Sequence, residues 1–75
     1  MATILVVDDS LTDRRLASLT LERALDCTIL DADSGEAALD QIEQLEPDLV
    51  LTDLQMPGLT GLDLVERLRE DWPHI

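Results

Sequence analysis

The sequence contains no lysine, and its five basic residues are all arginines. Seventeen acidic residues oppose them, so the formal net charge is −12 at pH 7. A surface with this charge repels nucleic acid and anionic lipid, and it attracts divalent cations or a basic partner. We therefore expect this segment to bind neither nucleic acid nor membrane.

Cysteine and long apolar runs are also scarce. Cys27 is the only cysteine, which excludes an internal disulfide, and its apolar neighbours favour a core position over a nucleophile. No stretch approaches the roughly 18 apolar residues of a membrane span. Residues 1–7 lack the basic start and the length of a signal peptide. These absences predict a cytoplasmic chain.

Hydrophobic residues make up 45% of the chain and recur with clear periods, which predicts a folded protein despite the charge. Seventy-five residues form one domain at most. A domain of this size buries only about 60% of its unfolded surface, so its core is marginal.

Three short apolar runs predict three β-strands, at 3–7, 27–32 and 48–52. The second run is the most polar, which suits the edge of a sheet. In the third, Leu49, Val50 and Leu51 are consecutive, a pattern typical of a strand that helices cover on both faces.

Each of the three predicted helices begins with two residues, three positions apart, that fit a capping box. The pairs are Ser10 with Asp13, Asp33 with Glu36, and Thr60 with Asp63. Apolar residues then recur at helical spacing and predict the inward faces. These residues are Ala17, Leu21, Ala24 and Leu25 in the first helix, Ala38, Ile42 and Leu45 in the second, and Gly61, Leu64, Val65 and Leu68 in the third. Pro47 and Pro73 mark the ends of the second and third helices.

Strands that alternate with helices predict a parallel sheet with right-handed crossovers. If the first and third strands are neighbours, Asp8, Asp9 and Asp53 converge where both strands end. Three like charges this close repel one another, so a bound cation or a raised carboxylate pKa is expected. Oxygen ligands of this kind suit Mg²⁺.

Four segments match, in order and spacing, a family of signalling domains. They are VVDDS at 6–10, ADSGEAAL at 32–39, PDLVLTDLQMPGLTG at 47–61 and ERLRE at 66–70. Through them the chain resembles the receiver domain of bacterial two-component response regulators. The most specific parts are the acidic pair after the first strand and the run Asp53, Met56, Pro57, Gly58. The resemblance implies a flavodoxin-like (CheY-like) fold, a doubly wound parallel sheet with strands in the order 2-1-3-4-5.

The resemblance also implies roles for individual residues. Asp53 would accept a phosphoryl group from a phosphohistidine on a sensor histidine kinase or a phosphotransfer protein. Asp9 and Asp53 would hold Mg²⁺, Asp8 would help chiefly through a bound water, and the backbone carbonyl of Gln55 would be a further ligand. An acyl phosphate is a reversible mark that suits a switch better than a metabolic product, so we expect a regulatory domain and not an enzyme.

The resemblance further implies that the chain stops where a fourth strand would begin. Residues 1–75 would then be an incomplete receiver, with strands in the order 2-1-3 and three helices. The rest of such a domain carries a Ser or Thr after strand four, a Lys after strand five and a switch aromatic. The third strand would have an open edge, and we expect a homodimer that pairs two copies along residues 48–52.

Two other functions stay open at this point. A half-receiver that is never phosphorylated could serve as an assembly or interaction piece. The segment ILDADSG at 29–35 resembles the D-x-D motif of haloacid-dehalogenase-type phosphatases, with Asp31 as nucleophile and Asp33 as acid or base. That family also needs a lysine, and this chain has none.

Overall fold

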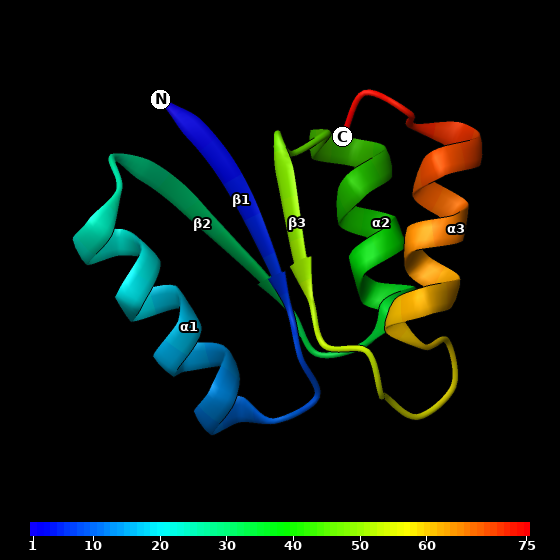
Figure 1. Cartoon of the computed structure of the whole chain (residues 1–75), viewed down its shortest axis with the longest axis horizontal. Coiled ribbons are helices and arrows are strands. Elements are labelled where there is room, and N and C mark those ends of the chain that lie inside the picture. Colours follow the sequence, from blue (N-terminus) through cyan, green and yellow to red (C-terminus); the bar gives the residue numbers. More distant parts are fainter.

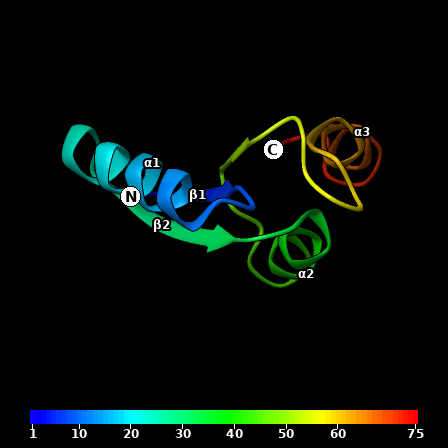
Figure 2. The same ribbon diagram turned by 90° about the horizontal axis from the view of Figure 1, so that it is seen from below.

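The computed structural model describes all 75 residues. Its elements are β1 (Ala2–Val7), α1 (Leu11–Ala24), β2 (Cys27–Ala32), α2 (Gly35–Leu45), β3 (Leu49–Thr52) and α3 (Gly61–Asp71). The strands form one parallel sheet in the order β2-β1-β3 (Figure 1). Helix α1 lies on one face of the sheet, and α2 and α3 lie on the other (Figure 2). The predicted order 2-1-3 and the doubly wound arrangement are confirmed.

The core lies between the sheet and the pair α2 and α3. Leu5 of β1, Ile42 of α2 and Leu64 of α3 are all 0% exposed and belong to one apolar cluster. Successive strand residues face opposite sides, so Ile4 and Val6 are buried on the face that carries α1. Burial on both faces explains why β1 is an unbroken apolar run.

The prediction that the third strand is covered on both faces is wrong on the side of α1. Leu49 and Leu51 are 52% and 46% exposed, whereas Val50 packs against the core on the other side. Helix α1 packs on β2 and β1 and leaves this face of β3 open (Figure 2). A continuous apolar run is compatible with burial on both faces, but whether a helix packs over each face depends on other parts of the chain.

The same open face explains why α1 has no fully buried residue. Ala17 and Leu21 are half-buried, but Ala24 and Leu25 are exposed, contrary to the prediction. Ala24 is the last residue of α1 and Leu25 lies beyond it. Cys27 is half-buried at the start of β2. None of the helices has the length and apolar character that crossing a membrane requires.

The capping box predicted at α3 is confirmed, whereas at α1 only the Ser10 N-cap is present, because the Ser10 N–H donates to Asp8 and not to Asp13. The Ser10 hydroxyl accepts a hydrogen bond from the Asp13 N–H at 3.3 Å, at the start of α1. At α3, the Thr60 hydroxyl accepts from the Asp63 N–H at 3.2 Å, and the Asp63 carboxylate accepts from the Thr60 N–H at 3.0 Å. Both bonds of the capping box are therefore present.

The predicted cap of α2 by Asp33 is wrong. The N-cap is Ser34, whose hydroxyl accepts from the Ala37 N–H at 3.1 Å. Glu36 does not reach back to the cap, because its carboxylate accepts from the Leu59 N–H at 2.9 Å in the segment before α3. Asp33 and Ser34 are both typical N-cap residues. Glu36, which a capping box at Asp33 requires, instead accepts the hydrogen bond from Leu59.

The predicted inward face of α2 is wrong at its last residue. Ala38 and Ile42 are buried, but Leu45 is 56% exposed. Leu45 is the last residue of α2, and Glu46 then takes a left-handed φ of 40° before the buried Pro47. The chain turns away at this point, so Leu45 has nothing to pack against.

Candidate functional site

Acidic residues follow the carboxyl ends of two neighbouring strands. Asp8 comes directly after β1, and Asp53 comes directly after β3. Val7 and Thr52 are register partners, and the Asp53 N–H donates to the Val7 carbonyl at 2.9 Å. This bond joins the two strand ends, so the carboxylates start from adjacent backbone positions.

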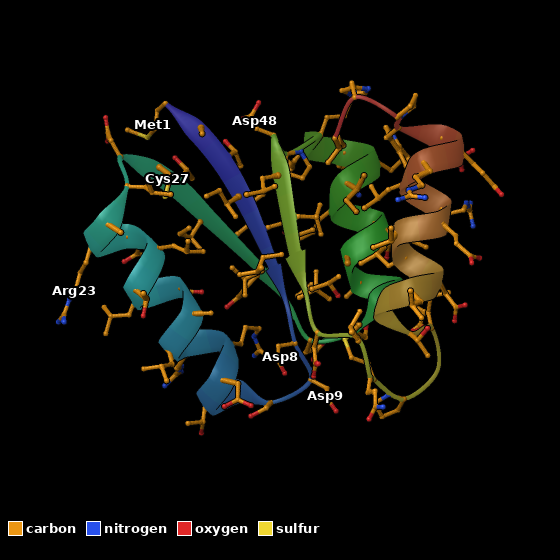
Figure 3. The ribbon with its side chains drawn as sticks, in the orientation of Figure 1. Met1, Asp8, Asp9, Arg23, Cys27 and Asp48 are labelled. Atoms are coloured by element: carbon orange, nitrogen blue, oxygen red, sulfur yellow. The ribbon has the colours of Figure 1, made fainter.

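The structure brings the three predicted carboxylates together. One oxygen from each of Asp8, Asp9 and Asp53 lies within 4.8 Å of the other two. Asp8 is half-buried, and the other two are exposed. Asp8 and Asp9 lie together after β1, at the opposite end of the sheet from Asp48 (Figure 3). Gln55 is exposed in the segment after Asp53.

The backbone and side chain of Asp8 are fixed by close neighbours. Its N–H donates to the carbonyl of Ala32, the last residue of β2, at 3.1 Å. Its Oδ1 accepts from the Ser10 N–H at 2.9 Å, so the residue that caps α1 also orients this carboxylate. The start of α1 and the acidic cluster are therefore built by the same short segment.

The segment after β3 is shaped by one buried side chain and two glycines. Met56 is 6% exposed and anchors the segment in the core. Gly58 has a φ of +75°, a conformation that side chains disfavour. A Cβ on Gly61 would overlap the carbonyl oxygen of Asp53. The close approach of α3 to Asp53 therefore requires glycine at 61, a reason that spacing alone did not reveal.

A hollow of about 270 Å³ adjoins the cluster. Its lining includes the acidic Asp8, Asp13 and Asp53 and the apolar Val6, Ala17 and Leu51. Asp13 was predicted only as part of a helix cap, and the pattern gave no sign that it would line this hollow. The acidic groups therefore lie beside apolar residues of α1 and β3.

The donor set at the cluster consists of carboxylate oxygens. Mg²⁺ prefers such hard ligands, usually one or two carboxylates together with water or phosphate oxygens. A divalent cation would also offset the repulsion among three like charges. The residues present therefore fit Mg²⁺.

The proposed phosphatase residues are not part of this cluster. Asp31 is an exposed residue of β2, and its Oδ2 lies 3.5 Å from Nε of Arg14. Asp33 is exposed in the turn before α2. This pairing gives no support to Asp31 as a nucleophile.

The model of the response regulator receiver domain family matches residues 4–75. The chain belongs to this family. Membership connects it with two-component signalling, in which receiver domains interact with histidine kinases or phosphotransfer proteins and bind Mg²⁺. Such domains are generally regulatory.

Individual relatives agree with this assignment. The nitrate/nitrite response regulator NarL of Escherichia coli is 41% identical over 70 residues, which cover 92% of this chain and 32% of NarL. A receiver domain protein from Clostridium thermocellum matches 100% of the chain and 60% of its own chain, with a TM-score of 0.93 and 31% identity. The Thermotoga maritima regulator TrrA, solved in complex with Mg²⁺ and BeF, matches 97% of the chain and 63% of its own, with a TM-score of 0.92 and 36% identity.

Proposed function

We propose that this chain is the phospho-acceptor module of a two-component phosphorelay and works in the cytoplasm. Asp53 receives a phosphoryl group from a phosphohistidine of a sensor histidine kinase or a phosphotransfer protein. The observation that carries the proposal is the convergence of Asp53 with Asp8 and Asp9 where β1 and β3 end, in a chain of the receiver family.

The proposal assigns Mg²⁺ to the acidic cluster. Asp9 and Asp53 hold the ion, Asp8 contributes chiefly through a water, and the carbonyl of Gln55 is a further ligand. When bound, the ion neutralises charge on the phosphoryl oxygens. The fixed position of Asp8 supports its role, because Ser10 already orients its carboxylate.

The transfer makes one bond and breaks one. An oxygen of the Asp53 carboxylate attacks phosphorus, the P–N bond of the phosphohistidine breaks, and its electron pair stays on the imidazole nitrogen. A carboxylate is a weak nucleophile, so the rate depends on position and on neutralised charge. Asp53 is exposed, which allows an imidazole on another protein to approach it.

The test is phosphorylation by a phosphohistidine donor with Mg²⁺, followed by intact mass spectrometry. We expect one phosphoryl group per chain, none on Asp53→Asn, and none when a chelator removes the cation. Asp40→Asn is the matched control, because Asp40 is an exposed aspartate of α2 outside the cluster. Equal labelling of Asp53→Asn and the unaltered chain would contradict the assignment of Asp53.

The rate of labelling carries separate information. The family resemblance implies a lysine and a hydroxyl that hold the phosphoryl oxygens, and these 75 residues contain no lysine. We therefore expect the chain by itself to react slowly with acetyl phosphate. Efficient labelling would show that such groups are dispensable here.

A second candidate function, an assembly or interaction piece that is not phosphorylated, draws on a different observation. Strand β3 lies at the edge of the sheet, and its residues Leu49 and Leu51 are exposed. An edge strand with apolar neighbours favours pairing with another chain. If this function is correct, Asp53→Asn leaves association with another chain unchanged. The unaltered chain is then not phosphorylated.

A further inference from the structure

Arg14 connects the acidic segment to two other elements. Its Nη1 donates to the carbonyl oxygen of Asp8 at 2.9 Å, and its Nε lies 3.5 Å from Oδ2 of Asp31. The Arg14 side chain is only 13% exposed, whereas Arg15 on the same helix is exposed. A single guanidinium from α1 therefore bridges the end of β1 and an acidic residue of β2.

Stability alone does not account for this placement. Burying a guanidinium is costly unless its donors find partners, and a buried ion pair is weak evidence of stabilisation. Nε of Arg14 is buried without a hydrogen-bond partner, so its contact with Asp31 is electrostatic. The hydrogen bond that Arg14 makes with good geometry is the one to the Asp8 carbonyl.

We propose that Arg14 is a positioning residue for the acidic cluster, which it organises by holding the Asp8 carbonyl. The proposal rests on the proposed function, in which this cluster holds a cation. A peptide group is planar, so fixing the Asp8 carbonyl also fixes the direction of the Asp9 N–H. The backbone that carries both carboxylates is thereby held where the two converge with Asp53.

Charge and position have opposite effects on cation binding, which makes the proposal testable. The positive charge of Arg14 repels a cation, so removing the charge alone would strengthen binding. Loss of a group that orients a metal ligand weakens binding, commonly by 10- to 100-fold. The sign of the change therefore separates a positioning role from a purely electrostatic one.

The experiment is a Mg²⁺ titration of the full chain, followed by NMR of the amides of residues 8–10 and 53–56. We expect Arg14→Met to raise the Kd roughly tenfold. Methionine keeps an apolar stem of similar length, and buried charges often tolerate such a replacement. Arg15→Met removes the same charge from an exposed neighbour, and we expect its Kd to stay equal or fall slightly. An Arg14→Met Kd equal to or below that of the unaltered chain overturns the proposal.

A second variant guards against misfolding. Arg14→Lys keeps the charge, but one ammonium cannot contact the Asp8 carbonyl and Asp31 together as the planar guanidinium does. Its Kd is expected to lie between those of the unaltered chain and Arg14→Met. If Arg14→Met does not fold, an Arg14→Lys Kd equal to that of the unaltered chain overturns the proposal.

Hydrogen exchange in the metal-free protein gives a readout that does not depend on cation binding. In Arg14→Met the Ser10 amide, which donates to Asp8, should exchange faster while the amides of residues 4–7 keep their protection. Equal acceleration at all of these amides indicates a merely structural role. If the unaltered chain shows no Mg²⁺ shifts at 8–10 and 53–56, the metal site of the proposed function fails, and the exchange result still decides the role of Arg14.

Discussion

Asp8 and Asp53 sit in different surroundings, and the difference suits different tasks. Asp8 is half-buried, and its carboxylate accepts from the Ser10 N–H. Asp53 is exposed, with its backbone joined to Val7. A rigid carboxylate favours ion binding because little ordering is needed, whereas an exposed one can meet a large donor protein. Asp8 therefore forms the fixed side of the cluster, and Asp53 forms its accessible side.

At the residue scale, Mg²⁺ or Mn²⁺ is predicted to bind weakly where the three carboxylates converge, because the cation relieves their repulsion. In an NMR titration the amides of residues 8–10 and 53–56 should shift first, and Asp9→Asn should weaken binding. Glu43 and Glu46 are exposed acids elsewhere on the surface and serve as the internal control. Shifts confined to them would mean that the ion is attracted only by net charge.

The acidic members of the site could be predicted from sequence, because a carboxylate after a buried strand has a position that topology alone fixes. The contact of Arg14 with Asp8 and the need for glycine at position 61 could not be predicted. Arg14 contacts Asp8 through a long side chain whose direction depends on how α1 packs. Gly61 matters because of the approach of the Asp53 carbonyl, and a sequence gives no distance between backbones.

At the scale of elements, strands and helices were predictable because each apolar run or helical spacing is bounded by turn residues. The exposed face of β3 was not predictable. Leu49 and Leu51 belong to the same apolar run as Val50, but only Val50 has a helix packed over it. Whether a face is covered depends on other elements, and a local pattern carries no information about them.

The cap of α2 offers a direct test of local structure. Ser34→Ala is expected to lower the free energy of unfolding by about 1 kcal/mol, because the Ala37 N–H loses its hydroxyl acceptor. Asp33→Ala is the matched control, since no hydrogen bond involves its side chain, and we expect little change. Chemical denaturation monitored by circular dichroism measures both. A larger loss for Asp33→Ala would restore the capping assignment that the structure contradicts.

At the scale of the whole molecule, two features of β3 act together. The strand pairs with β1 on one side and has no strand on the other, so its outer backbone groups are free to pair. On the face toward α1 a groove of about 440 Å³ is lined mainly by apolar residues, among them Leu16, Leu21 and Leu51. Against association stands the net charge of −12 on each copy. Salt screens this repulsion but hardly affects the apolar contacts.

We therefore predict a homodimer in which two copies pair along residues 48–52, with an association that strengthens as salt is added. Light scattering coupled to size exclusion should show the dimer, and Leu51→Asp should remove it by placing a charge beside the paired edge. Leu62→Asp is the matched control, because Leu62 is 61% exposed on α3 and belongs neither to β3 nor to the lining of the groove. A folded monomer at micromolar concentration, with amides of residues 49–52 protected from exchange, would mean that the β3 edge is stable without a partner.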